Sequence, residues 1–220
     1  MTTRRILQSV LLLGVAGLIA ILVWFILSSG TDDTDAEAAT QGGDPQVVRD
    51  DSHVINQAPD EKAVLVEFLD FECEVCRAYY PTVEQLREQY SDELTLVIRY
   101  FPIPSHANAN NAAIAVEAAA RQGELEAMYQ QMYATQADWG EARDSKAHVF
   151  RGFAEEMGLD MAQYDADVAD ADVTARVQRD FDEGVRLGVQ GTPTFFLDGE
   201  KVSVENPGDL TRAVEAALAP

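Results

Sequence analysis

The sequence predicts an α/β domain that carries an inserted helical segment and is preceded by one N-terminal transmembrane helix. Three observations predict this fold class. Residues 6–30 form an uncharged, largely apolar run. Residues 63–69 are an apolar run suited to a buried strand, and a helical pattern follows them. Residues 105–188 show helical spacing with little strand character, before strand signals return after residue 189.

The composition describes a chain that can fold and that repels anions. Of its 220 residues, 47% are hydrophobic and 25% are charged, which is enough apolar material for one core. The formal net charge is −22, and all 38 acidic residues follow Gly30. Such a surface repels phosphate backbones and anionic headgroups. Binding to nucleic acid is therefore excluded as a function.

The N-terminal apolar segment is long enough to cross a bilayer. As a helix, residues 6–27 span roughly 33 Å, against a hydrocarbon core of about 30 Å. Arg4 and Arg5 precede the run and acidic residues follow it, so residues 1–5 are predicted to be cytoplasmic and the rest of the chain extracytoplasmic. The alternative is a cleaved signal peptide, with Ala36-Glu37-Ala38 as the cleavage site. In both interpretations the folded domain is exported from the cytoplasm.

Residues 31–60 are predicted to be an acidic flexible linker, because they are rich in Asp, Thr, Ala, Gly and Gln and show no helical or strand period. The end of this segment, around residues 47–56, is expected to pack on the domain as an arm. The domain itself is predicted to comprise a first part (residues 61–104), a helical insertion (105–188) and a second part (189–220).

The chain has two cysteines, Cys73 and Cys76, and their spacing is informative. A disulfide that closes so short a loop restricts the unfolded chain very little, so it is a poor stabiliser. A helix is expected to begin at or just after Cys73. Backbone N–H groups at a helix N-terminus stabilise a thiolate, and Cys76, one turn later, can resolve a mixed disulfide. The pair therefore predicts catalytic thiol–disulfide exchange.

Three other interpretations of the cysteine pair stay open at this point. A zinc site needs about four ligands, and His53, His106 and His148 stand at no recognisable spacing from the pair. An inert structural disulfide is the second interpretation, and a redox sensor that switches a partner is the third. His106 is expected to have a surface or capping role, and the alternative is a place near the rim of the site.

Further stretches complete a family pattern around the cysteines. They are Phe68 to Cys76, Pro81 in the following helix, Val97 to Pro102, and Gly191 to Phe196. Together these stretches resemble the thioredoxin superfamily, and more closely its DsbA-like thiol–disulfide oxidoreductases. The combination of Cys-X-X-Cys after a strand with a late Gly-Thr-Pro is specific. The resemblance covers residues 48–219 and implies a thioredoxin-like fold with an inserted helical domain.

The resemblance implies a role for each matching residue. Cys73 corresponds to the attacking cysteine and Cys76 to the buried resolving cysteine. Thr192 and Pro193 correspond to the cis-proline pair, which packs against the disulfide and offers backbone hydrogen bonds to a substrate. Glu67 corresponds to a buried acid, whose pKa burial would raise so that it exchanges a proton with the resolving thiol. The alternative for Glu67 is a carboxylate on an exposed strand face.

The dipeptide between the cysteines, Glu74-Val75, departs from the commonest family versions, which often carry Pro, Gly or His there. Glu74 joins Asp70 and Glu72 near Cys73, and these carboxylates oppose thiolate formation while the helix N-terminus favours it. Glu74 and Val75 are therefore expected to tune the pair to a moderate reduction potential.

The sequence thus predicts an extracytoplasmic thiol–disulfide oxidoreductase that acts as an oxidant on exported proteins and needs no dissociable cofactor or metal. Reduced exported proteins are the expected substrates. The resemblance implies a quinone-linked membrane oxidase as the partner for reoxidation. The alternatives are a disulfide reductase or isomerase, and a tethered binding or chaperone module whose disulfide is inert.

Overall fold

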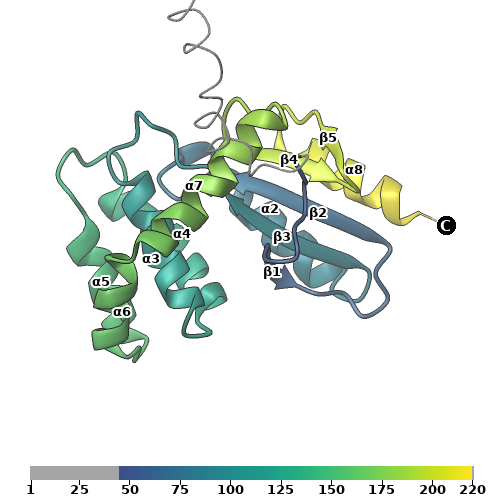
Figure 1. Cartoon of the computed structure of the whole chain (residues 1–220). Helices are drawn as coiled ribbons and strands as arrows, with labels where there is room; N and C mark the ends of the chain where they lie inside the picture. The colour runs from purple at the N-terminus through teal and green to yellow at the C-terminus, as the bar shows by residue number, and fades with distance from the viewer. Residues whose placement is uncertain (1–44, 220) are drawn as a thin grey trace, which may run out of the picture. The chain divides into compact units, whose positions relative to one another are not determined.

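A five-stranded sheet in the order β1-β3-β2-β4-β5 organises the computed structural model, which describes residues 45–219 (Figure 1). The strands β2 and β3 pair in parallel, and the other neighbours are antiparallel. β3 is buried along its whole length, as expected for a central strand covered on both faces. The strands are β1 (His53–Asn56), β2 (Ala63–Leu69), β3 (Leu94–Tyr100), β4 (Thr194–Leu197) and β5 (Glu200–Val202).

Five helices lie between β3 and β4 in the chain, where the sequence predicts a helical insertion. In Figure 1, α3 to α6 gather beside the sheet, and α7 leads back across it. The thioredoxin-like α/β arrangement of sheet and helices is as expected. The helices are α2 (Glu74–Gln89), α3 (Ala109–Ala120), α4 (Leu125–Trp139), α5 (Ala147–Glu156), α6 (Met161–Val168), α7 (Ala171–Arg186) and α8 (Pro207–Leu218).

Alternate side chains of β2 pack into two different hydrophobic clusters, one on each face of the sheet. Val66 and Phe68 belong to a cluster on the side of α7, which includes Phe181. Leu65 and Leu69 belong to the larger cluster on the other side, which contains both cysteines and the apolar residues of α2. Since side chains two residues apart share a face, Glu67 points to the same side as the cysteines.

Helix α7 approaches the sheet closely at Gly184. A Cβ at this position would lie 2.7 Å from Cδ2 of Phe101 and 3.1 Å from Cδ1 of Phe68. Because glycine has no Cβ, the ring of Phe101 stacks on that of Phe181, with 4.6 Å between the ring centroids. The helical insertion is thereby joined tightly to the sheet.

The predicted linker, residues 31–60, is too long at its C-terminal end. β1 falls inside it and pairs with β3, with Val54 opposite Val97. The carbonyls of Gln46 and Val47 also accept hydrogen bonds from Nη1 of Arg99, both at 3.0 Å. The expectation that residues 47–56 pack as an arm is therefore confirmed. A strand of four residues is too short for a period-2 pattern, so its pairing could not be predicted.

The predicted transmembrane segment, residues 6–30, lies outside the described residues, as do the tip (1–5) and the first part of the linker. Within residues 45–219, no helix has the length and the apolar character that crossing a bilayer requires.

Candidate active site

Cys73 and Cys76 lie at the start of α2, directly beyond β2. Cys73 is the N-cap residue of the helix, as expected, and Cys76 stands in its first turn. Both are free cysteines. Cys73 is 8% exposed and Cys76 is fully buried. Of the two sulfurs, Cys73 is therefore the one that an external thiol can reach.

The surroundings of Cys73 lower the pKa of its thiol to about 5. The hydrogen bond from the Cys76 thiol contributes most. The backbone N–H groups of Cys76 and Val75 act in the same direction, while burial opposes them. Cys73 is thus a thiolate at neutral pH, because these hydrogen bonds lower its pKa by more than burial raises it.

The two carboxylates just upstream of the pair are turned into the protein. Asp70 accepts hydrogen bonds from the N–H groups of Glu72 at 2.8 Å and Ile103 at 2.9 Å. Glu72 accepts from the N–H groups of Asn108 at 2.5 Å and Glu141 at 3.1 Å. Both side chains are buried. They hold the loops after β3 and α4 against the active site, a role that their charges in the sequence do not reveal.

Glu67 and Cys76 form the buried side of the site. Burial above all raises the pKa of Cys76 well above its ordinary value, and the Cys73 thiol and the Glu67 charge add to this. Burial also raises the pKa of Glu67 to about 8, assisted by the charges of Cys73 and Glu84. Glu67 is 1% exposed, so the interpretation as a buried acid is correct and the exposed carboxylate is wrong.

The turn before β4 lies against Cys73. In its protonated form, the thiol of Cys73 donates a hydrogen bond to the carbonyl oxygen of Thr192, with 3.4 Å between sulfur and oxygen. The Thr192–Pro193 peptide bond is cis. The hydroxyl of Thr194 donates to the carbonyl of Gly191 at 2.7 Å and closes the turn. Two segments 119 residues apart in the sequence thus meet at the sulfur.

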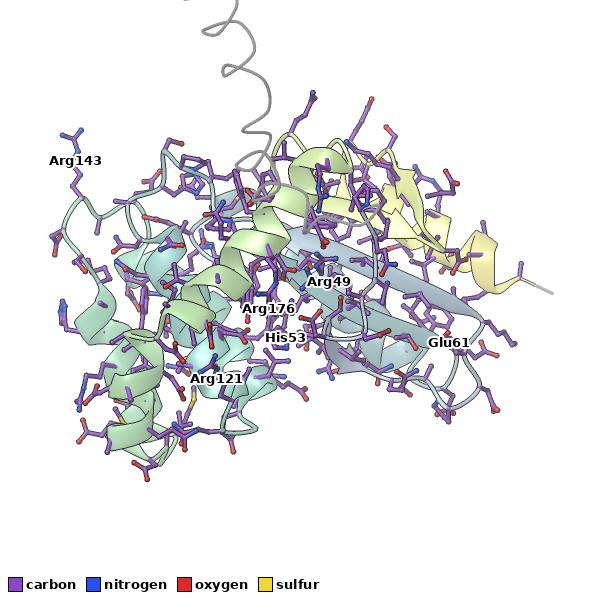
Figure 2. All side chains as sticks on the ribbon, viewed as in Figure 1. Arg49, His53, Glu61, Arg121, Arg143 and Arg176 are labelled. Carbon is purple, nitrogen blue, oxygen red and sulfur yellow. The ribbon has the colours of Figure 1, made fainter. Side chains whose placement is uncertain are left out.

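Glu74 and Val75 both face solvent beside Cys73, and Val75 is 52% exposed. They border a groove of about 390 Å³. Arg143, which also lines this groove, points outward from the loop after α4 (Figure 2). The groove is lined by Glu72, Cys73, Glu74, Val75, Ser105, His106, Ala107, Glu141 and Arg143.

His106 has more than the surface or capping role that the sequence suggests. The N-cap residue of α3 is Asn108. His106 instead lines the groove of Cys73 and places its Nδ1 2.6 Å from Oδ2 of Asp70. No spacing in the sequence signals this pair, because it forms only when the loop after β3 folds back onto the end of β2.

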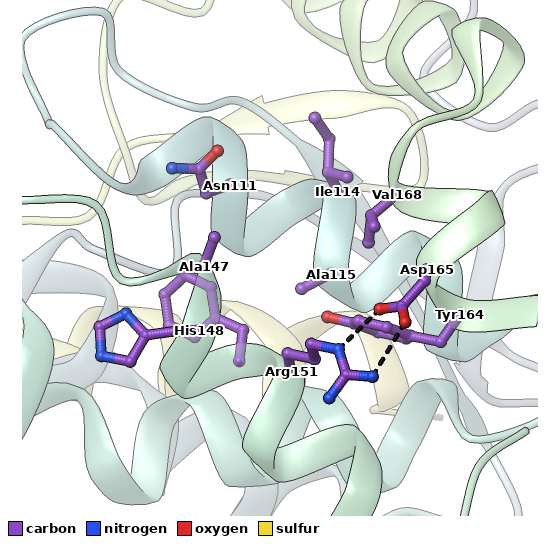
Figure 3. Close-up of a pocket in the computed structure, with 10 residues that line it drawn as sticks. Asn111, Ile114, Ala115, Ala147, His148, Arg151, Tyr164, Asp165 and Val168 are labelled. Atoms are coloured by element: carbon purple, nitrogen blue, oxygen red, sulfur yellow. Dashed lines mark hydrogen bonds and ion pairs between the residues drawn. The ribbon is translucent and has the colours of Figure 1, made fainter. Parts of the chain in front are cut away.

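A second cavity, of about 310 Å³, lies within the helical insertion between α3, α5 and α6 (Figure 3). Ala115 and Phe150 contribute apolar walls, and Arg151 binds Asp165 at 2.7 Å beside them. Neither cysteine lines this cavity, so it is not part of the thiol site. Among residues 45–219, no three His, Cys, Asp or Glu side chains gather as a metal site.

Comparison with known proteins places this arrangement in a family. The family model described as thioredoxin matches residues 53–216. A thioredoxin-like oxidoreductase from Silicibacter pomeroyi is 27% identical, with a TM-score of 0.64 over 80% of this chain and 97% of that chain. DsbA2 from Pseudomonas aeruginosa is 24% identical, with a TM-score of 0.61 over 75% of this chain and 93% of that chain.

Longer curated proteins also match part of the chain. The Na(+)/H(+) antiporter NhaA of Herminiimonas arsenicoxydans is 34% identical over 147 residues, which are 65% of this chain and 22% of that protein. The Na(+)/H(+) antiporter NhaA 1 of Mycobacterium sp. (strain KMS) is 34% identical over 166 residues, 72% of this chain and 25% of that protein. The chain thus spans about a quarter of the length of these relatives.

Proposed function

This chain belongs to the thioredoxin superfamily, and we propose that it is a DsbA-like thiol–disulfide oxidoreductase that oxidises exported proteins outside the cytoplasm. One observation carries the proposal: an accessible thiol of pKa about 5, Cys73, stands beside a fully buried thiol, Cys76, and under the Thr192 carbonyl. A structural disulfide needs neither a lowered pKa nor an accessible sulfur.

The geometry supports oxidation in two exchanges. A substrate thiolate attacks Sγ of Cys73 in the disulfide, the Cys73–Cys76 bond breaks, and Cys76 leaves with the electron pair. Glu67, protonated at neutral pH because its pKa is about 8, gives Cys76 a proton. A second substrate thiolate then attacks the substrate sulfur of the mixed disulfide, and Cys73 leaves as a thiolate. The substrate loses two electrons, which the protein gains.

The ionisation of Cys73 favours the oxidising direction. A thiol of low pKa leaves readily, and a stabilised thiolate favours the reduced form of the protein. The pKa of about 5 lies between that of thioredoxin, about 7, and that of the strong oxidant DsbA, about 3.5. We therefore infer a moderate reduction potential, between about −270 and about −120 mV.

The proposed function implies a membrane location, protein substrates and a partner that reoxidises the cysteine pair. Residues 6–30 would anchor the domain, with residues 1–5 in the cytoplasm, because the run has the length and the flanking charges of a membrane span. The substrates would be reduced exported proteins, and a membrane redox partner would reoxidise the pair. The longer relatives are named as antiporters, and this chain matches only about a quarter of their length.

Trapping of substrates tests the proposal. Cys76→Ala removes the resolving thiol, so mixed disulfides between Cys73 and exported proteins should accumulate, while Cys73→Ala should trap none. Equilibration with glutathione gives the potential. A potential near that of thioredoxin, with a reduced pair in cells, would favour a reductase or isomerase. A Cys73 that stays unreactive at neutral pH and traps no protein would favour a binding module with an inert disulfide.

A further inference from the structure

A buried carboxylate holds His106 at the edge of the active-site groove. Nδ1 of His106 lies 2.6 Å from Oδ2 of Asp70, whose side chain is fully buried. Hydrogen bonds from the N–H groups of Glu72 and Ile103 fix the orientation of that carboxylate. An imidazole whose Nδ1 donates to a carboxylate carries no proton on Nε2 when it is neutral. Nε2 of His106 is then a base.

The imidazole shares this groove with the attacking sulfur. Cys73 and His106 both line it, and 32% of the His106 side chain remains exposed. The other ionisable groups of the groove are Glu72, Glu74, Glu141 and Arg143. Glu72 is engaged by backbone N–H groups, and arginine stays protonated. Of the side chains that remain, the imidazole of His106 is ordinarily a stronger base than the carboxylates of Glu74 and Glu141.

The first exchange begins with the loss of a proton from the substrate thiol on this side of the disulfide. The attacking species is a thiolate, yet an ordinary cysteine thiol of pKa about 8.5 is only about 3% ionised at pH 7. In the oxidised protein, the sulfurs of Cys73 and Cys76 are bonded to each other and accept no proton. Glu67 is buried and protonated at neutral pH. A substrate thiol must therefore lose its proton to a group in the groove or to water.

We propose that His106 is the general base for the incoming substrate thiol, with Asp70 as its positioning residue. Nε2 takes the S–H proton while the substrate sulfur bonds to Sγ of Cys73 and the Cys73–Cys76 bond breaks. The electron pair of that bond goes to Cys76, and His106 returns its proton to solvent through its exposed face. This role rests on the proposed function and specifies its substrate as a protonated protein thiol.

Monothiols of different acidity test the role. The rate constant for reduction of the oxidised protein is measured at pH 7 with an alkyl thiol of pKa about 8.5 and an electron-poor aryl thiol of pKa about 5. A base can accelerate the reaction of the alkyl thiol by at most about 30-fold, because only about 3% of that thiol is ionised without it. It cannot accelerate the reaction of the aryl thiol, which is already ionised. His106→Asn should therefore slow the alkyl thiol by about 10-fold or more and the aryl thiol by less than about 2-fold.

The variants separate the chemistry from structural damage. Asn can still donate to Asp70 but has no basic nitrogen, and Asp70→Asn should lower the alkyl rate selectively, to a smaller extent. His148→Asn is the matched control, because His148 lines the cavity of the helical insertion (Figure 3) and should leave both rates unchanged. Equal losses with both thiols, or none, in His106→Asn would overturn the role. A wild-type protein that reacts with neither thiol would overturn the proposed function as well.

Discussion

Arg99 on β3 and Asp180 on α7 form a fully buried ion pair, in which Nε of Arg99 donates to Oδ1 of Asp180 at 2.7 Å. The other carboxylate oxygen accepts a hydrogen bond from the N–H of Tyr100 at 3.2 Å. Arg49 from the arm and Arg176 from α7, both labelled in Figure 2, approach the same carboxylate at 3.5 Å and 3.3 Å. The pair therefore ties the arm, the central sheet and the helix that returns from the insertion.

Removal of this carboxylate should destabilise the fold strongly. Asp180→Ala leaves Arg99 and Arg176 without the acceptor that they share, and breaking a buried pair from one side costs about 3–5 kcal/mol. Urea unfolding measures the loss. Asp165→Ala, which breaks the exposed pair with Arg151, is the control and should cost less than about 1 kcal/mol. Similar losses in the two variants would contradict the assigned importance of the buried pair.

The stability of the reduced protein should respond to pH through two opposed groups. Cys73 has a folded pKa of about 5 and an ordinary value of 9.0. Between about pH 5 and pH 9 the Cys73 thiol keeps its proton in the unfolded chain but has lost it in the folded protein. The free energy of unfolding therefore rises with pH in this range. This contribution is complete above pH 9 and is lost as pH falls through about 5. Glu67 acts in the opposite direction, because its folded pKa of about 8 lies above its ordinary value of 4.5. Its contribution to stability is complete below pH 4.5 and is lost as pH rises through about 8.

Between about pH 5 and 8 these contributions should largely cancel in the wild type. In Glu67→Gln, the unfolding free energy of the reduced protein should rise by up to about 1.4 kcal/mol per pH unit, less where solvent screens the thiolate. In Cys73→Ser, it should fall with pH over the same range. Urea midpoints at four pH values, with reductant present, give these slopes. Parallel curves for wild type and Glu67→Gln would show that Glu67 does not titrate in this window.

The Tyr133 hydroxyl should be dispensable for folding. Its oxygen is buried and has no hydrogen-bond partner among residues 45–219, while its ring stacks on that of Tyr80 with 4.9 Å between the centroids. Tyr133→Phe keeps the ring and removes the unsatisfied group, so stability should stay the same or rise by about 1–3 kcal/mol. Tyr133→Ala should cost about 3–5 kcal/mol. Thermal unfolding compares the two variants, and a marked loss in Tyr133→Phe would reveal a partner for the hydroxyl.

The close approach of α7 to the sheet should make Gly184 intolerant of a methyl group. Gly184→Ala forces the ring of Phe101 to shift, at a cost of about 1–3 kcal/mol. Gly152 in α5 is the matched control, because a Cβ there meets nothing within 4 Å. Gly152→Ala should stabilise the protein by about 0.5–1 kcal/mol through the higher helix propensity of alanine. Denaturant midpoints that move the same way in both variants would contradict the close packing.

Local patterns predicted β2 and the start of α2 closely. The apolar run of residues 63–69 is the strand itself, and Cys73 is the N-cap of the helix. Strand periodicity and helix N-termini are properties of neighbouring residues, so the sequence carries them directly. β1 escaped prediction because four residues hold no period, and their place depends on hydrogen bonds to β3.

The sequence by itself determined the cysteine pair, its position at a helix N-terminus and the helical character of the insertion, because residue identity, spacing and short-range periodicity encode them locally. Only the tertiary structure decided that Glu67 is buried, that Thr192 touches Cys73 and that Asp70 holds His106 in the groove. Each of these depends on which face of a strand is covered or on which distant loops meet. Burial and hydrogen bonding between remote segments shift a pKa, and neither is present until the chain has folded.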